Sequence, residues 1–330
     1  MNRAEGSSAA GGVTGLGHEV YQLDTRMAGH DKITASYLIR AGRPCLVETG
    51  TAPSAPVVRD ALAGLGIGSQ DLATVVVTHI HLDHAGGVGD IAAMFPAAEI
   101  VVHERGARHL ADPGRLMASA RRVYGDALET LFGEMRPVAA DRIRAVGGEG
   151  SIDLGAGRRL SSYYSPGHAR HHVGLVDSAS GDLYVGDAAG VFIQDTRDLR
   201  PATPPPDFDL ATALGSLRMF AALAPSRLLF SHYGPVTAVA ETLDRSAAEL
   251  NLWVAETRRA RDARLDLDHA VAMVAERTRE RYRALAPGGD PDLAVRTETV
   301  SSTAASVAGI LHWLGKETPA GAAGSAGPAG

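Results

Sequence analysis

The chain has 330 residues, 45% of them hydrophobic and 21% charged, which is typical of a globular protein with a large core and excludes a disordered chain. Its 32 basic and 38 acidic side chains give a formal net charge of -6, so the overall charge indicates no nucleic-acid or anionic-membrane partner. The single cysteine, Cys45, excludes an internal disulfide and lies in an apolar run that predicts a buried thiol.

The first 17 residues are rich in Gly, Ala and Ser and contain no apolar block of the secretory kind. We therefore expect a flexible leader at 1–17 and a cytoplasmic protein. No run approaches the roughly 18 consecutive apolar residues of a membrane span, so we expect no membrane partner.

From residue 18 onward, short β-type runs bounded by Gly or Asp alternate with stretches that have helical spacing of apolar residues. The run at 72–78 is continuous and β-branched, as expected of a strand buried on both faces. The expected strands lie at 19–24, 34–39, 44–48, 72–78, 99–102, 159–164, 172–177, 182–185 and 227–230. The expected helices lie at 56–65, 91–95, 106–132 (broken at Pro113-Gly114 and at Gly125) and 209–222.

The character of the chain changes near residue 236, where strands give way to long amphipathic helices rich in Ala, Arg, Glu and Leu. A proline-dense linker at 201–206 precedes the last expected strand. The expected organisation is a leader at 1–17, a catalytic domain at 18–235, a helical extension at 236–316 and a disordered tail at 317–330.

Three histidines and an aspartate follow the buried strand at 72–78, in the segment Thr78-His79-Ile80-His81-Leu82-Asp83-His84. Alternate side chains of an extended segment share a face, so His79, His81 and Asp83 are expected to point the same way, and a turn at Gly86-Gly87 brings His84 beside them. Imidazole and carboxylate donors at this density favour Zn²⁺, Fe or Mn²⁺ over calcium.

The pattern His-x-His-x-Asp-His after a strand resembles the metallo-β-lactamase superfamily, and further matching motifs follow in the expected order. These are Ser165-Pro166-Gly167-His168, Val185-Gly186-Asp187 and Ser231-His232-Tyr233-Gly234-Pro235, preceded by Glu48-Thr49-Gly50 where the family usually has Asp-Thr-Gly. The resemblance covers roughly residues 21–235 and implies an α/β fold, the αββα sandwich of this superfamily, here with a C-terminal helical extension.

The resemblance also implies the ligand set of two divalent metal ions, with Zn²⁺ expected first and Fe or Mn as alternatives. One ion would be held by His79, His81 and His168, the other by Asp83, His84 and His232, and Asp187 would contact both. A metal-bridging hydroxide would then attack a carbonyl or phosphoryl group, and Asp83 would hold or relay the proton.

Several branches of the superfamily differ in features that this sequence has or lacks. The commonest zinc β-lactamases have a cysteine where Asp187 stands, so antibiotic hydrolysis is not expected as the main role. Hydroxyacylglutathione hydrolases and lactonases match the ligand set best, which favours cleavage of a thioester, ester or lactone. An iron-dependent sulfur dioxygenase is the redox alternative, and a catalytically silent metal-binding protein is a third.

Four further residues are candidates for contact with a small-molecule substrate. Tyr233 follows a ligand and is considered as an oxyanion donor, and His30 lies in the early hairpin that overhangs the metals in this family. His172 follows the His168 loop, and Phe208 ends the proline linker as an apolar wall of the pocket.

Other partners are less favoured. A nuclease or phosphodiesterase needs an electropositive surface, and the arginine-rich run at 258–264 is interspersed with Asp262 and preceded by Glu256, so we expect no nucleic acid. The C-terminal helices either cap the pocket or form a homodimer, because both uses suit their apolar faces around Leu250, Trp253, Val254, Ile310 and Trp313.

Overall fold

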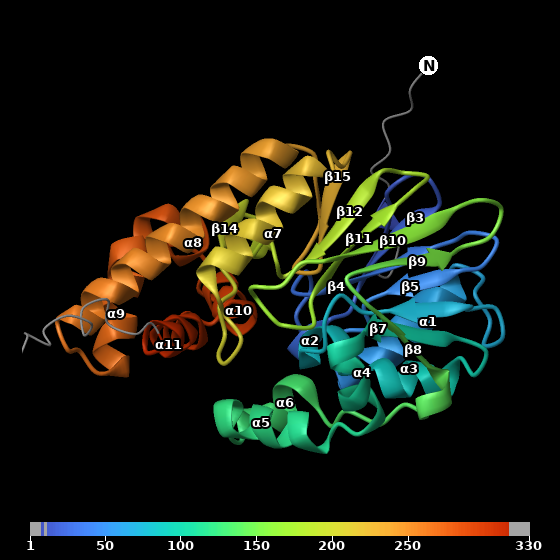
Figure 1. Cartoon of the computed structure of the whole chain (residues 1–330), viewed down its shortest axis with the longest axis horizontal. Helices are drawn as coiled ribbons and strands as arrows, with labels where there is room; N and C mark the ends of the chain where they lie inside the picture. Colours follow the sequence, from blue (N-terminus) through green and yellow to red (C-terminus); the bar gives the residue numbers. More distant parts are fainter. Residues whose placement is uncertain (1–7, 10–11, 317–330) are drawn as a thin grey trace, which may run out of the picture.

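The computed structural model describes residues 8–9 and 12–316, and its layers run helix, sheet, sheet, helix (Figure 1). The predicted αββα sandwich with C-terminal helices is thereby confirmed. Among the described residues, no helix combines the length and the apolar character that a membrane crossing needs.

The first sheet has eight strands that lie side by side in chain order, antiparallel up to β5 and parallel from β5 to β8. Parallel neighbours end at the same edge, which is where the histidine motif begins. The strands are β1 (Ser8–Ala9), β2 (Val13–Gly15), β3 (Val20–Asp24), β4 (Ala35–Ile39), β5 (Cys45–Val47), β6 (Thr74–Val76), β7 (Glu99–His103) and β8 (Ile143–Val146).

The second sheet has six strands, in which β12 and β15 form a parallel pair and the other neighbours are antiparallel. A separate hairpin joins β13 (Val191–Ile193) to β14 (Asp198–Arg200). The strand order is β16 (Pro235–Val236), β15 (Arg227–Phe230), β12 (Asp182–Gly186), β11 (Val173–Asp177), β10 (Arg159–Tyr164) and β9 (Glu149–Asp153).

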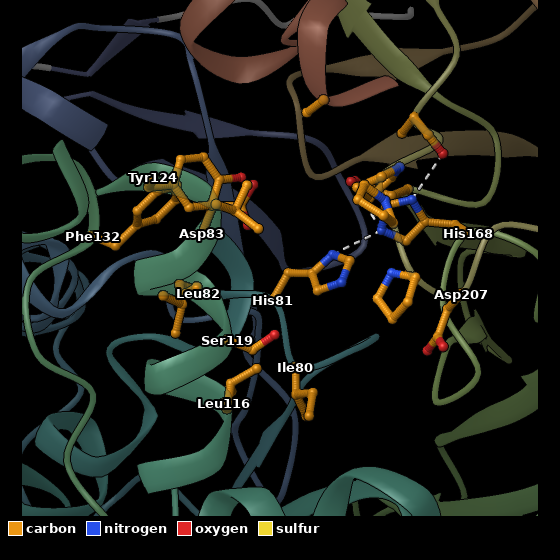
Figure 2. A pocket seen from close by; sticks show the side chains of 18 of the residues that line it. Ile80, His81, Leu82, Asp83, Leu116, Ser119, Tyr124, Phe132, His168 and Asp207 are labelled. Atoms are coloured by element: carbon orange, nitrogen blue, oxygen red, sulfur yellow. Dashed lines mark hydrogen bonds and ion pairs between the residues drawn. The ribbon is translucent and has the colours of Figure 1, made fainter. Parts of the chain in front are cut away.

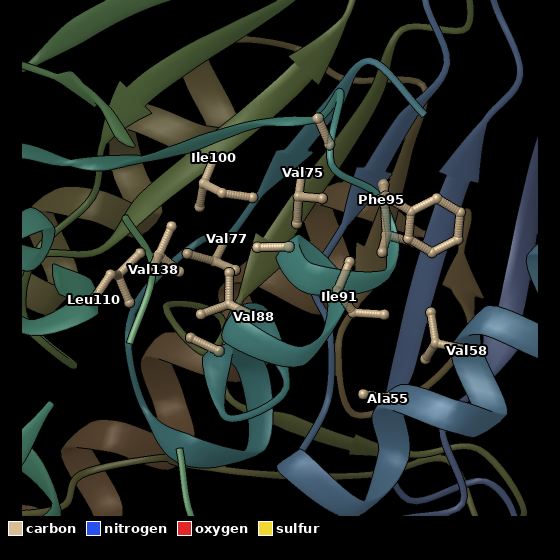
Figure 3. Packing of buried hydrophobic residues seen from close by; sticks show 14 of the residues in the cluster. Ala55, Val58, Val75, Val77, Val88, Ile91, Phe95, Ile100, Leu110 and Val138 are labelled. Carbon is tan, nitrogen blue, oxygen red and sulfur yellow. The ribbon is translucent and has the colours of Figure 1, made fainter. Parts of the chain in front are cut away.

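Alternation along the strands divides the apolar residues among three core clusters, because successive side chains of a strand point to opposite faces. On β6, Val76 packs between the sheets, whereas Val75 and the following Val77 pack under the helices of the first sheet. Figure 3 shows these two valines beside Val88 and Ile91 of the covering helix. Each strand therefore contributes to two layers at once.

Six helices follow the strands of the first sheet in the described chain, and three of them occupy the segment for which broken helical periodicity was predicted. The breaks fall at Pro113-Gly114 and Gly125, where proline and glycine end the helical pattern. The helices are α1 (Ala55–Gly64), α2 (Leu82–Ala85), α3 (Val88–Met94), α4 (Glu104–Ala111), α5 (Gly114–Tyr124) and α6 (Ala127–Phe132).

The outer face of the second sheet is covered by α7 and by the helices after residue 236. Leu183 and Leu228 of this sheet share one apolar cluster with Leu250, Trp253 and Ile310 of the helices. Among the described residues, the helical segment therefore shares its apolar core with the second sheet. Its helices are α8 (Val239–Asp262), α9 (Leu267–Thr278), α10 (Pro291–Val300) and α11 (Thr303–Leu314), and α7 spans Leu210–Ala222.

The structure tests part of the predicted leader at 1–17 but not the predicted tail at 317–330. Residues 13–15 form β2, which pairs with β3, so this part of the expected leader is a sheet strand and not a flexible segment. The predicted disordered tail at 317–330 and residues 1–7 and 10–11 of the leader lie outside the described residues. Cys45 is fully buried, as predicted.

Candidate metal centre

The histidine motif leaves β6 as a short loop and then turns into the helix α2. His81 lies at the N-cap of this helix, so Asp83 and His84 project from a helical turn. The expectation that Asp83 shares an extended face with His79 and His81 is therefore wrong. The turn directs the four donors into two groups.

The first group consists of His79, His81 and His168; each offers one ring nitrogen, and these three nitrogens lie within 4.8 Å of one another. His81 Nδ1 is 3.1 Å from His79 Nε2 and 2.9 Å from His168 Nε2. His168 reaches this group from the loop after β10, far along the chain from the histidine motif. Three imidazoles that point toward one another are a typical set of protein ligands for a transition-metal ion.

The second group consists of Asp83, His84 and His232, whose donor atoms also lie within 4.8 Å of one another. Asp83 Oδ2 is 3.5 Å from His84 Nε2 and 3.4 Å from His232 Nε2. His232 comes from the loop that follows β15 in the second sheet. Both sheets therefore contribute to one site.

Asp187 lies between the two groups, at the carboxyl end of β12. Its Oδ1 is 3.3 Å from His84 Nε2 and 3.2 Å from His232 Nε2, while its Oδ2 is 3.6 Å from His168 Nε2. The two oxygens of one carboxylate thus face different donor groups, as a bridging ligand requires.

The rear nitrogens of two of these rings, those of His168 and His232, contact backbone carbonyl groups. His168 Nδ1 lies 2.9 Å from the Ala202 carbonyl oxygen, and His232 Nδ1 lies 3.3 Å from the Ile33 carbonyl oxygen. If each Nδ1 donates to its carbonyl, each Nε2 lone pair faces the centre.

Buried polar atoms at the centre lack hydrogen bonds, which tests whether a metal belongs there. Among the described residues, His84 Nε2, His232 Nε2 and Asp187 Oδ1 are buried and make no hydrogen bond. Such atoms are costly to leave unpaired, and a bound cation would satisfy all three together. The donor set of imidazoles and carboxylates therefore fits a divalent transition metal.

Burial and neighbouring charges shift the pKa values of the histidines at the centre, downward in the first group and upward for His232. Burial, reinforced by neighbouring imidazoles, lowers the pKa of His81 to about 3 and that of His79 well below its usual value. Burial also disfavours charge on His232, but the carboxylates of Asp187 and Asp83 outweigh it and raise the pKa of His232 to about 9. The first group is therefore neutral without metal, whereas His232 holds a proton.

Glu48 stands where the superfamily usually has aspartate, and its role is visible behind His84. Its Oε1 accepts hydrogen bonds from the Thr78 hydroxyl at 2.5 Å and the Thr78 backbone N–H at 3.3 Å. The same oxygen lies 3.6 Å from His84 Nδ1. Glu48 is buried and thus places a negative charge behind a metal ligand.

The loop that presents Asp187 depends on a glycine and on His172. Gly186 has φ +50°, and a Cβ there would lie 2.4 Å from His172 Nε2. That nitrogen accepts the Asp187 backbone N–H at 3.1 Å, and His172 Nδ1 is 2.8 Å from the Ser165 hydroxyl. Both ring nitrogens of the buried His172 are engaged in these contacts, so His172 positions Asp187. The prediction that His172 contacts substrate is therefore wrong.

A cavity of about 960 Å³ lies over the donor groups, and Figure 2 shows His81, Asp83 and His168 facing it. Its walls come from α4, α5 and α6, from the proline segment 202–207 and from residues 299–306. The segment between α10 and α11 therefore lines the cavity. The apolar faces around Leu250, Trp253, Val254 and Ile310 are buried within the chain, and Trp313 is partly buried against the same cluster.

Three other predicted substrate contacts do not line this cavity. Tyr233 packs in the core between the sheets, where its hydroxyl interacts with Gln22 and Asp24, so the oxyanion role assigned to it is wrong. Phe208 is buried with its ring 5.7 Å from that of Trp313, and His30 is absent from the cavity lining. The proline linker itself does form a rim, through Ala202 and residues 204–207.

Tyr124 lines the cavity and was not predicted, and of the two histidines after the His168 loop it is His171 and not His172 that lines it. Burial and the nearby carboxylates of Asp83 and Asp187 raise the pKa of Tyr124 to about 12. Figure 2 shows Tyr124 and Phe132 on the side of the cavity where Asp83 lies. Tyr124 is at the end of a helix with no sequence motif, so only the packing of α5 over the site identifies it.

The family model of the metallo-beta-lactamase superfamily matches residues 31–232, which is more than half of the chain. The metallo-beta-lactamase fold-containing protein ST1585 of Sulfurisphaera tokodaii is 32% identical over 167 residues, which cover 49% of this chain and 61% of that protein. A hydroxyacylglutathione hydrolase of Synechococcus sp. is 31% identical over 130 residues, which cover 39% of this chain and 38% of that enzyme. The chain thus spans less than two thirds of the length of these relatives.

Among solved structures, the metallo-beta-lactamase family protein TTHA1429 of Thermus thermophilus has a TM-score of 0.62 at 21% identity. The similarity covers 92% of this chain and 95% of that one, so it extends into the C-terminal helices. At this identity the likeness is one of fold.

Proposed function

The chain belongs to the metallo-beta-lactamase superfamily, and on that basis we propose that it is a hydrolase whose centre holds two divalent ions, zinc first among them. One observation carries the proposal: Asp187 directs one carboxylate oxygen toward His168 and the other toward His84 and His232. A carboxylate in this position can reduce the repulsion between two neighbouring cations.

When bound, such ions supply a Lewis acid for a carbonyl oxygen and a water that loses its proton near neutral pH. His79, His81 and His168 would hold one ion, Asp83, His84 and His232 the other, and Asp187 would be shared.

Asp83 is suited to accept the proton released by the attacking water. Its contacts with His84 and His232 both use Oδ2, and its side chain is 18% exposed toward the cavity. Burial opposes ionisation of Asp83, but the neighbouring His84 and His232 outweigh it and hold the pKa of Asp83 below its usual range. Asp83 is therefore ionised, and its Oδ1 can accept a proton from the attacking water.

Tyr124 is suited to donate a hydrogen bond to the oxyanion that forms on the substrate. A tyrosine hydroxyl is protonated at neutral pH, and the raised pKa of Tyr124 is consistent with this. Tyr124 lines the cavity on the side of Asp83. Tyr124 thus takes the role that the sequence assigned to Tyr233.

We propose a small-molecule thioester, ester or lactone as the substrate. The hydroxyacylglutathione hydrolases among the relatives support an acylated thiol, although the alignment covers only 38% of the one from Synechococcus. The cavity of about 960 Å³ is large enough for an acyl group together with its carrier.

The test combines metal analysis with a panel of thioesters, lactones and phosphodiesters. We expect two zinc ions per chain, and turnover of an acyl substrate that falls about a thousandfold in Asp187→Ala together with metal content. Asp207→Ala is the matched control, because Asp207 lines the cavity rim and pairs with Arg170 at 3.2 Å. A single iron with oxygen consumption, or tight metal without turnover of any panel member, would contradict the proposal.

A further inference from the structure

The mouth of the cavity has a charge opposite to that of the whole chain. Five arginines line the cavity, and one of them, Arg170, pairs with Asp207. Of the other four, Arg105 and Arg108 lie three positions apart on α4, and Arg115 and Arg122 lie seven apart on α5. Each pair therefore shares a helix face. The chain as a whole has a net charge of -6.

The carboxylates that line the same cavity do not neutralise these arginines. Asp83 and Asp187 belong to the metal centre, and Asp207 pairs with Arg170. Glu104 is the one remaining carboxylate of the lining among the described residues. The excess of positive charge is thus local to this wall.

The four guanidinium groups have no carboxylate partner within 4.0 Å in the described chain. Arg105 Nη1 donates to the Tyr164 hydroxyl at 2.7 Å, and Arg108 Nε lies 3.2 Å from His109 Nε2. The guanidinium groups of Arg115 and Arg122 make no hydrogen bond to any residue that the structure describes, although both residues lie within the helix α5. Like charges gathered around one opening repel each other unless an anion joins them.

The face of α5 that turns to the cavity mixes cations with apolar surface. Arg115, Ser119 and Arg122 lie on it at positions i, i+4 and i+7, next to Leu116 and Val123. No residue of α5 is buried, and Val123 is 54% exposed. The wall therefore offers both charge and apolar contact to a molecule that enters the cavity.

We propose that these arginines form a subsite for an anionic group, a carboxylate or a phosphate, on the substrate of the hydrolase. This inference rests on the proposed function. The acyl group of the substrate would lie at the metal centre, and the arginines would bind the thiol or alcohol part that carries it. Guanidinium groups bind carboxylate and phosphate through paired N–H donors. The focused positive potential would also attract such a substrate to an otherwise acidic protein.

The experiment uses matched pairs of acetyl thioesters. Acetyl-S-phosphopantetheine and acetyl-S-pantetheine differ by a phosphate, and the acetyl thioesters of 3-mercaptopropionate and 3-mercaptopropionamide differ by a carboxylate. We expect the wild-type protein to prefer the anionic member of at least one pair in kcat/KM. The pair that shows the preference identifies the anion.

The variant is the double substitution Arg115→Gln and Arg122→Gln, and the matched control is Arg121→Gln. Arg121 lies on the same helix and does not line the cavity. In the double variant the ratio of kcat/KM for anionic over neutral substrate should fall roughly tenfold or more. Salt at about 1 M should lower the same ratio in the wild type, because it screens exposed charges. Equal kcat/KM within both wild-type pairs, or an equal loss in Arg121→Gln, would overturn the inference.

A binding measurement separates this inference from the proposed function. The S-ethyl thioethers of the same four thiols cannot be hydrolysed, and calorimetric titration into the metal-loaded protein reports their affinity directly. Tighter binding of an anionic thioether that is lost in the double variant supports the subsite even if no thioester is hydrolysed. Equal affinity for charged and neutral thioethers overturns it even if hydrolysis is observed.

Discussion

The two sides of the cavity are built in different ways. The metal side is made of side chains at strand ends and on the short helix α2, and among them His79 is fully buried and Asp187 is 6% exposed. The opposite side is made mainly of helices, and one of them, α5, buries no residue at all. Tyr124 at the end of that helix is 37% exposed.

This difference indicates that the metal side of the cavity determines the chemistry, whereas the helical side determines which substrate binds. Buried ligands with fixed rear contacts hold one geometry, because neither the ring nor its partner can move without breaking a hydrogen bond. A half-exposed helix can change its surface residues at little cost in stability. Changes on the metal side should therefore alter metal affinity, and changes on the helical side should alter kinetics and specificity.

The largest effect should be the pH dependence of metal binding, which tests the metal side. The pKa of His232 lies near 9 without metal because Asp187 and Asp83 stabilise its charged form. Below that pH the metal must displace the proton, so apparent affinity should rise at least about tenfold per pH unit up to about pH 9 and then level off. Chelator competition at several pH values, corrected for the protonation of the chelator, measures this. An affinity that stays constant between about pH 7 and about pH 9 would contradict it.

Replacing Glu48 by glutamine should weaken metal binding by roughly 10- to 100-fold, because the charge behind His84 Nδ1 is lost while the hydrogen bonds from Thr78 can remain. Glu104→Gln removes a carboxylate from the cavity rim and serves as control. Competitive titration of zinc against a chelator distinguishes the two variants. Equal zinc affinity in both would remove Glu48 from the metal side.

On the helical side, Tyr124→Phe should lower kcat about tenfold through loss of one oxyanion donor, with metal content unchanged. The ring stays in place against Phe132, whose centroid is 4.8 Å away. Tyr233→Phe is the matched control, since its hydroxyl lies in the core. Steady-state kinetics should show a loss for Tyr124 alone, and an equal loss in both variants would return the role to Tyr233.

The smallest effect should follow from Gly309→Ala in α11, which supports the proline rim. A Cβ at Gly309 would lie 1.9 Å from the Thr203 carbonyl oxygen, so α11 must move away from the rim. We expect a loss of about 1–3 kcal/mol, seen as a fall of a few °C in Tm. Gly315→Ala is the control, because its nearest neighbouring atoms are 3.5 Å away. An unchanged Tm would show that the rim does not depend on this contact.

Much of the fold was predictable because its signals are local. The strand predicted at 227–230 coincides with β15, and the breaks at Pro113-Gly114 and Gly125 divide the helices as predicted. β8 and β9 were missed because they are short, and half or more of their residues are not buried, so no apolar run distinguishes them from loop. The strand β2 was missed for a similar reason, since Val13–Gly15 is short and lies in a stretch rich in glycine.

The sequence by itself determined which residue types could bind metal and at which strand ends they occur, because those motifs are contiguous and follow buried strands. Only the tertiary structure decided that Asp83 and His84 project from the turn of α2 and not from an extended segment, and that Tyr124 and the arginines of α4 and α5 line the cavity over the site. The physical reason is that a ligand motif depends on residues adjacent in the sequence, whereas a cavity wall depends on residues far apart in the sequence. The packing of separate helices against the two sheets brings those distant residues together.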